Sequence, residues 1–227
     1  MGMATAGLIC RAAEDTRSDE RRLFEITGKT FLPLGSRFPQ LSPRFDPRNE
    51  DDFILATLGD IGFVFNGPMV DKIMFEGCYD NIPRLSAALH DPHVLLAFCW
   101  YDSGGSYGFA MFKDQSIVRR ILMTADKVIA EGTPLREEPA DKTIEDRKSL
   151  LEKLAGQERL EGTEQDEIGD AIATARNEIV AVVDAVIAAN SGWSPWTLDD
   201  LSKMSYRYCR AAMVPAHRAQ NSGSPLP

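Results

Sequence analysis

The 227-residue sequence lacks any run of about 18 consecutive apolar residues, which excludes a transmembrane helix. Its 17 glycines and 13 prolines are too few for a collagen-like or wholly disordered chain. Basic residues are outnumbered, with 25 Lys and Arg against 34 Asp and Glu, and the net charge of -9 argues against a nucleic-acid binder. The 4 cysteines include no Cys-x-x-Cys pair, so we expect reduced thiols in a cytoplasmic protein.

Several nucleotide and metal fingerprints are also missing. The Walker A sequence, the dinucleotide fingerprint, His-Glu-x-x-His and the EF-hand loop do not occur, so we expect no cofactor. His90 and His93 flank Asp91, but Pro92 breaks any shared helical face and no third ligand is evident. We therefore predict no metal site. No secretory signal is apparent either, because charged residues directly follow Gly7–Cys10.

The patterns that are present predict an α+β protein. We expect a mostly antiparallel sheet of about five strands with packed helices and a C-terminal helical segment. The chain divides into an N-terminal, partly irregular arm (1–52), a sheet-containing core (53–140), a helical segment packed on the core (141–213) and a disordered tail (214–227). Proline interrupts the second half of the arm, which therefore cannot form a regular helix, and one short helix is expected before it, around Ser18–Thr27.

The core contains five apolar runs that are bounded by turn residues, a pattern typical of strands. These runs are Phe53–Leu58, Ile61–Phe65, Val94–Tyr101, Tyr107–Phe112 and Ile117–Met123. Gly59-Asp60 is a two-residue hairpin signal between the first two runs. The third run is apolar at both parities, which predicts a strand covered on both faces. Met69–Phe75 fits a strand or a helix, Asp80 or Asn81 can cap a helix that has Pro83 in its first turn, and Gly132–Pro139 is expected to be a loop.

Helical periodicity dominates the C-terminal segment. Thr163 and Asp166 form a capping box, and apolar residues then follow a heptad pattern from Ile168 to Val186. We expect this helix to stop at Asn190-Ser191-Gly192 and to pack against a partner helix over Asp141–Ala155 and against the sheet. A homodimer through the 165–190 helix is the alternative. A second capping box, Thr197 and Asp200, predicts a final helix that carries Leu201, Met204 and Tyr208.

One motif suggests a nucleophile. Gly104-Gly105-Ser106-Tyr107-Gly108 matches the Gly-x-Ser-x-Gly pattern, in which the serine sits on a tight turn between a strand and a helix. A strand precedes Ser106, but no helical period follows it. The pattern therefore favours a glycine-rich loop that joins two antiparallel strands.

Two adjacent arginines lie within an apolar strand. Arg119 and Arg120 must point to opposite faces of the sheet, so if both faces are covered, at least one guanidinium needs an acidic or anionic partner. An ion pair with Glu137 or Glu138, or an edge strand facing water, would satisfy this need. The functional alternative is an anion-recognition site that includes the loop Asp102–Ser106.

Part of the core resembles a family of uncharacterised, soluble bacterial α+β domains. The similarity rests on the segment that begins Tyr107-Gly-Phe-Ala-Met-Phe and ends Val-Arg-Arg-Ile121, followed by Gly132-Thr-Pro-Leu-Arg-Glu-Glu138. It covers residues 55–139. In that family a Gly-Phe-aromatic hairpin with Asp-Gly at its turn precedes a Gly-Glu-Pro-Leu-Pro loop, and here Gln115 replaces the hairpin glycine. The resemblance implies a bacterial α+β context and no particular activity.

Two functions follow from these features. The first is a non-catalytic protein-binding protein, an immunity-like inhibitor of a bacterial toxin, because the acidity is spread through the core and the helical segment and favours a basic protein partner. Its candidate binding residues are Trp100, Tyr101, Asp102, Tyr107, Arg119 and Arg120. The alternative is an enzyme for a small anionic substrate, with a pocket formed by the Arg119/Arg120 strand, the 102–108 loop and the 132–139 loop. Its candidate catalytic residues are Ser106, Glu137 and Glu138.

Overall fold

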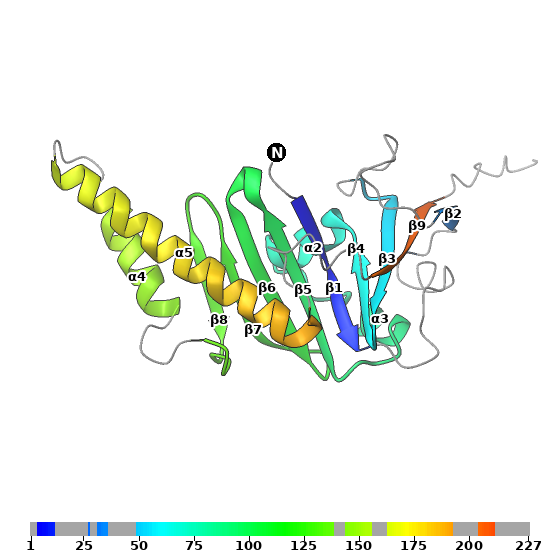
Figure 1. Ribbon diagram of the computed structural model, residues 1–227. Coiled ribbons are helices and arrows are strands. Elements are labelled where there is room, and N and C mark those ends of the chain that lie inside the picture. Colours follow the sequence, from blue (N-terminus) through cyan, green and yellow to red (C-terminus); the bar gives the residue numbers. More distant parts are fainter. Residues whose placement is uncertain are drawn as a thin grey trace, which may run out of the picture.

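The computed structural model describes residues 4–11, 27, 31–35, 49–138, 144–155, 163–192 and 204–211. Within these residues, a single 9-stranded sheet has the order β2-β9-β3-β4-β1-β5-β6-β7-β8, and every neighbouring pair is antiparallel (Figure 1). The strands are β1 (Ala4–Arg11), β2 (Phe31–Gly35), β3 (Asp52–Leu58), β4 (Ile61–Phe65), β5 (Val94–Tyr101), β6 (Ser106–Lys113), β7 (Ser116–Met123), β8 (Val128–Gly132) and β9 (Ser205–Ala211). The α-helices are α2 (Gly67–Met74), α3 (Ile82–Ala88), α4 (Ile144–Ala155) and α5 (Thr163–Ser191). The predicted α+β class with an antiparallel sheet is confirmed.

All five predicted strands are present, as β3 to β7, but β1, β2, β8 and β9 also belong to the sheet, so the predicted size of about five strands is wrong. The β3–β4 hairpin closes with Leu58 opposite Ile61, so Gly59-Asp60 forms the two-residue turn expected from the sequence. The segment Leu95–Trp100 of β5 is at most 1% exposed at every position. This burial confirms that β5 is covered on both faces, because successive strand residues point to opposite sides of the sheet.

The N-terminal segment differs from its prediction as an arm. β1 lies between β4 and β5 in the middle of the sheet, where Gly7 is opposite both Phe65 and Phe98. β2, which also belongs to the expected arm, pairs with β9 at the edge. Residues 4–11 find their partners more than 45 positions further along the chain, and no local pattern specifies such distant pairing. Except for Thr27, the helix expected around Ser18–Thr27 lies outside the described residues.

Two further strands lie in segments where no strand was predicted. β8 precedes the predicted polar loop Gly132–Pro139, shares only Gly132 with it, and pairs with β7 through Arg119 and Gly132. β9 lies where the capping box at Thr197 predicted a helix, so that helix is wrong for Ser205–Ala211. This segment pairs with β2 on one side and with β3 on the other, so hydrogen bonds to both neighbours stabilise it as a strand. The predicted tail, 214–227, lies outside the described residues.

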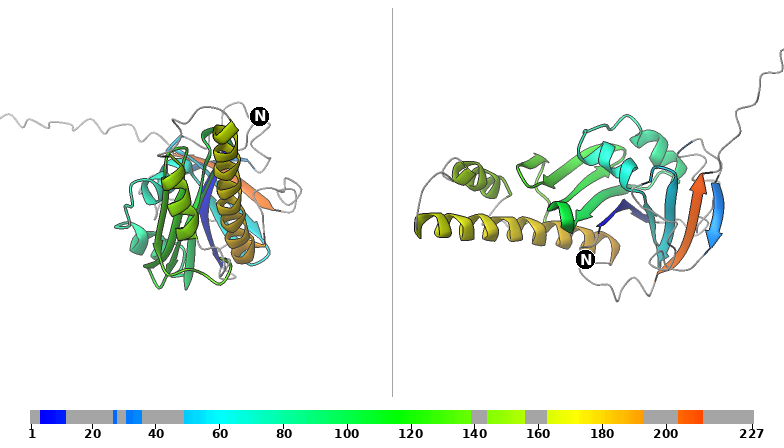
Figure 2. Two further views of the ribbon diagram at one scale, coloured as in Figure 1. Left: turned by 90° about the vertical axis from the view of Figure 1, so that its left-hand side faces the viewer. Right: turned by 90° about the horizontal axis from the view of Figure 1, so that it is seen from above.

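Helices cover the sheet on both faces. α2 and α3 lie on one face, whereas α4 and α5 lie on the other (Figure 2). Leu95, Ala97 and Cys99 of β5 join the core beneath α2 and α3, while Leu96 and Phe98 join the core beneath α5. Alternate residues of this apolar strand therefore contribute to two separate cores, one on each face of the sheet. The fold has three layers, with the sheet between two layers of helices.

The helices begin and end largely where their sequence signals indicate. Asn66 caps α2 by accepting a hydrogen bond from the Met69 amide at 2.8 Å, which resolves the ambiguous Met69–Phe75 segment as mostly helix. Asn81 is the N-cap residue of α3, with Pro83 in its first turn. α5 begins at Thr163 and ends at Ser191, as the capping box and the Asn-Ser-Gly stop predicted.

The long helix α5 extends beyond the last strand of the sheet. Its 29 residues span about 43 Å, and its N-terminal half continues past β8 beside α4 (Figures 1 and 2). The C-terminal half of its heptad pattern is buried against the sheet, since Ile179 and Val186 are 0% exposed. Dimerisation through this helix stays a prediction. Of the helices that the structure describes, none is both long enough and apolar enough to cross a membrane.

Candidate functional site

The predicted aromatic residues separate into buried and accessible members. Trp100 is 1% exposed and packs edge-to-face on Tyr107, with ring centroids 4.9 Å apart. It therefore belongs to the core beneath α5. Tyr101, the next residue along β5, points to the opposite face and remains partly exposed.

Tyr101 lies in a small acidic and aromatic surface next to α2, which we call the α2 patch: Asp71, Phe75, Glu76 and Tyr101. The Tyr101 hydroxyl donates a hydrogen bond to Asp71 Oδ1 at 2.9 Å. Phe75 stacks on the Tyr101 ring with centroids 6.5 Å apart and is 37% exposed. The patch thus presents an accessible aromatic pair beside two carboxylates.

The protonation states within the α2 patch follow from burial and charge. Burial raises the pKa of Asp71, the hydrogen bond from Tyr101 opposes this shift, and the charge of Glu76 adds to it. Burial and the neighbouring Asp71 carboxylate both raise the pKa of Tyr101 far above its ordinary value. Tyr101 therefore remains a protonated hydrogen-bond donor at neutral pH, which keeps its ring positioned under Phe75.

On the other face, Tyr107 has a similar arrangement. Its hydroxyl donates to Asp102 Oδ1 at 3.3 Å. Burial and the charge of Asp102 raise the pKa of Tyr107, so it too stays protonated at neutral pH. Asp102 begins the short 3₁₀ turn η2 (Asp102–Gly104), which connects β5 to β6. The two tyrosines therefore belong to opposite faces of the same sheet end and do not form one surface.

The serine of the Gly-x-Ser-x-Gly motif begins strand β6. Gly105 adopts a left-handed conformation with φ 57° after η2, and Ser106 then pairs with Tyr101 across the β5–β6 hairpin. The Ser106 hydroxyl donates to the Gly104 carbonyl at 3.4 Å. A nucleophile turn requires a helix at this point, so the hairpin interpretation of the motif describes the geometry.

Arg119 is fully buried and pairs with two glutamates on the α4 side of the sheet. It donates to Glu138 from Nε at 2.8 Å and from Nη2 at 2.5 Å, and its Nη1 donates to Glu145 at 2.7 Å and to the Gly132 carbonyl at 3.2 Å. Burial opposes the charge of Arg119, but the hydrogen bonds to Glu138 and Glu145 outweigh it and raise the arginine's pKa. The guanidinium therefore holds β7, the 133–138 loop and α4 together.

Arg120 is buried on the opposite face. Its Nε and Nη2 donate to the Met74 carbonyl at the end of α2, at 3.2 and 2.5 Å, and its Nη1 donates to Glu131 at 3.2 Å. A cation at a helix C-terminus interacts favourably with the unpaired carbonyls there. Both arginines are thus engaged within the fold, where the sequence required a partner for at least one.

Of the residues of the expected anionic-substrate pocket, Arg119 and Glu138 meet as a buried ion pair, but Arg120 and Ser106 do not join them. Arg119 and Arg120 lie on opposite faces of β7, and the carboxylate of Glu137 pairs with Arg136 at 2.7 Å. Arg119 is opposite Met111, five residues along β6 from Ser106, a separation of about 17 Å. Alternation along β7 separates Arg119 from Arg120, and the register of β6 with β7 separates Arg119 from Ser106, although these residues are close in sequence.

In the described part of the chain, the histidines do not belong to a metal-binding cluster. His93 Nδ1 lies 2.7 Å from Asp114 at the exposed β6–β7 turn. Among the described residues, no group of three or more His, Cys, Asp or Glu side chains is arranged to hold a metal ion. Burial raises the pKa of the Cys99 thiol far above its ordinary value, so this cysteine behaves as a core residue.

Sequence reasoning missed Phe75, Asp71 and Glu145 as partners of the predicted residues. Phe75 follows the last turn of α2. Its exposure depends on how the sheet and the next loop pack around it, which the sequence does not display. Glu145 lies in the first turn of α4, and only the docking of that helix brings it to Arg119.

Comparison with known proteins matches the chain to no protein family, no curated protein and no solved structure.

Proposed function

We propose that this chain is a non-catalytic protein-binding protein whose α2 patch contacts a basic partner. The supporting observation is the exposed Phe75, stacked on Tyr101 beside the carboxylates of Asp71 and Glu76. Among the described residues, the exposed large hydrophobic side chains are Phe75, at 37%, and Ile117, at 39%. Of these two, Phe75 has an aromatic neighbour that is fixed by a hydrogen bond.

The chemistry of the α2 patch suits an arginine- or lysine-bearing surface. Aromatic side chains with a fixed ring lose little conformational entropy on binding and often dominate interface energetics. A cation above the Phe75–Tyr101 pair would gain a cation–π interaction and would also be attracted by Asp71 and Glu76. The net charge of -9 supports attraction of a basic partner over a longer range.

We extend the proposal to an immunity-like inhibitor of a bacterial toxin on the same two features, an acidic chain and an accessible aromatic surface. This version predicts that co-production of the chain protects cells from a toxin encoded beside its gene. Substitution of Phe75 should abolish that protection if the α2 patch is the contact.

The test compares two matched variants, Phe75→Ser and Ile117→Ser, which each remove one exposed apolar side chain. Tagged wild-type and variant chains are used to recover partners from lysate of the source cells, with identification by mass spectrometry. We expect a basic protein that is recovered by the wild type and by Ile117→Ser and is lost with Phe75→Ser. Recovery of the same proteins by all three chains, or no partner at all, would contradict the proposal.

A further inference from the structure

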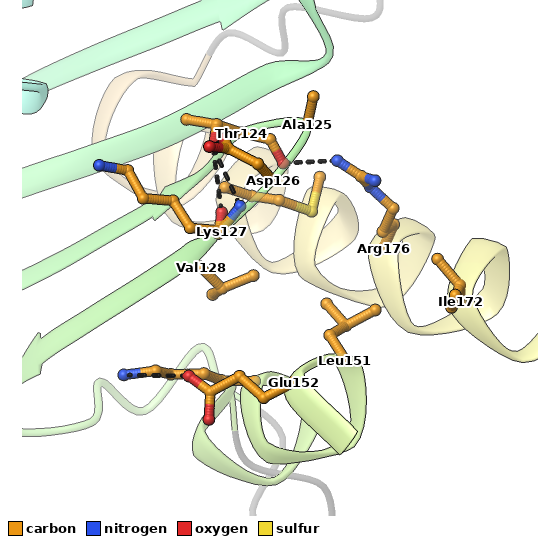
Figure 3. Close-up of a pocket in the computed structure, with 11 residues that line it drawn as sticks. Thr124, Ala125, Asp126, Lys127, Val128, Leu151, Glu152, Ile172 and Arg176 are labelled. Carbon is orange, nitrogen blue, oxygen red and sulfur yellow. Dashed lines mark hydrogen bonds and ion pairs between the residues drawn. The ribbon is translucent and has the colours of Figure 1, made fainter. Parts of the chain in front are cut away.

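A pocket lies between the β7–β8 turn and the two helices that extend past the sheet edge. Its volume is about 300 Å³, at the lower end of the range for small-molecule sites. The turn residues Thr124–Lys127 form one side, Leu151 of α4 the second, and Ile172 and Arg176 of α5 the third (Figure 3). The pocket is separate from the α2 patch, because α2 covers the other face of the sheet.

The floor of the pocket is apolar. Val128 is 9% exposed and Met123 is 1% exposed, while Leu151 and Ile172 are half-buried. Figure 3 shows Leu151 pointing from α4 toward Val128 of β8. An apolar ligand segment placed here would cover these side chains and bury additional nonpolar surface.

Arg176 supplies the polar side of the pocket. Its side chain reaches from α5 toward the β7–β8 turn, where Nη2 donates to the Thr124 carbonyl at 2.5 Å (Figure 3). A guanidinium carries five N–H donors, so further donors are available for a planar carboxylate. Arg176 therefore combines a fixed position with remaining hydrogen-bonding capacity.

The other charged residues around the pocket have local partners or face outward. Glu152 lies 3.9 Å from Lys148, and Asp126 accepts a hydrogen bond from the Thr124 hydroxyl at 2.7 Å. Lys127 points away from Arg176 in Figure 3. With three cations and two carboxylates, the lining has a net charge of +1, in contrast to the -9 of the whole chain.

We propose that this pocket binds a small monoanionic carboxylate with an apolar body, its carboxylate on Arg176 and its apolar part against Leu151, Ile172 and Val128. The inference does not depend on the proposed protein-binding function, because the two surfaces lie on opposite faces of the sheet. Binding requires both the ligand's charge and its apolar contacts, since a single exposed ion pair contributes little binding free energy by itself.

The test uses three probes that separate these requirements: octanoate, 1-octanol and acetate. Isothermal titration calorimetry on the full chain should show octanoate binding at least tenfold more tightly than either of the other two. Methyl NMR spectra should show the largest shift changes at Leu151, Ile172 and Val128. Arg176→Gln should raise the octanoate dissociation constant at least tenfold, whereas Arg136→Gln, at a side chain that is 90% exposed, should leave it unchanged.

Three results would overturn the proposal. They are equal affinity for octanol and octanoate, methyl shifts confined to another part of the molecule, and an Arg176→Gln variant that folds and binds octanoate as the wild type does. If Arg176→Gln does not fold, the comparison of the three probes and the location of the methyl shifts on the wild-type chain still decide the outcome.

Discussion

Replacement of Arg119 by methionine should strongly destabilise the fold. The substitution keeps an unbranched apolar side chain in the buried space but leaves the carboxylate of Glu138 without its bidentate partner. That carboxylate belongs to a side chain that is 2% exposed, so water cannot replace the lost hydrogen bonds. Removal of one partner from a buried ion pair costs about 3–5 kcal/mol, and we expect Arg119→Met to lower the free energy of unfolding by this amount.

The structure also assigns most of that cost to Glu138. The side chain of Glu145 is 46% exposed and can turn to solvent, so loss of its bond to Arg119 should cost less than about 1 kcal/mol. The double variant Arg119→Met/Glu138→Gln removes the uncompensated charge and retains an oxygen for the Leu135 amide, which now donates to Glu138 at 2.9 Å. We expect the double variant to recover at least about 2 kcal/mol relative to Arg119→Met.

Urea unfolding at pH 7, followed by circular dichroism, measures these differences by linear extrapolation. Arg136→Met is the matched control, because Arg136 also pairs with a glutamate but its side chain is 90% exposed. Its loss should cost less than about 0.5 kcal/mol. The reasoning fails if Arg119→Met costs no more than Arg136→Met, or if the double variant is no more stable than Arg119→Met alone.

Two other predictions concern packing and pH. Gly108→Ala should lower the free energy of unfolding by about 1–3 kcal/mol in the same assay, because an added Cβ would lie 2.4 Å from the Ile121 carbonyl oxygen. Gly104→Ala is the control and should be tolerated, since the atom nearest to its added Cβ is 3.9 Å away. The hydrogen bond from Arg119 lowers the pKa of Glu145 below 4.5, so its stabilisation is present above that pH and is lost as the pH falls through the folded-state value. Glu145→Gln should therefore reduce the loss of stability measured between pH 5 and about pH 3, and an unchanged pH profile would refute this assignment.

Local patterns were sufficient where an element and its signal occupy the same short segment. The β3–β4 hairpin needed only two apolar runs and Gly59-Asp60 between them. The beginning and end of α5 followed from a capping box at Thr163 and from the Asn-Ser-Gly stop. These signals act through backbone conformation and side-chain-to-backbone hydrogen bonds within a few residues, so the sequence alone displays them.

Elements whose formation depends on distant partners were missed. β1 and β9 are stable as strands because each has a strand on both sides, and all four of those partners are more than 40 residues away along the chain. In β9 the alternation Tyr206-Arg207-Tyr208 was available as a strand signal, but the prediction followed the capping box at Thr197 instead. Tertiary pairing overrides a weak local preference of this kind.

The sequence by itself determined the α+β class, the five strands β3 to β7, the boundaries of α5 and the need of the adjacent arginines for a partner. Only the tertiary structure decided the central place of β1, the opposite environments of Arg119 and Arg120, and the exposure of Phe75 beside Tyr101. The physical reason is that periodicity and caps are properties of neighbouring residues. Register, burial and charge pairing depend instead on which distant segments come into contact.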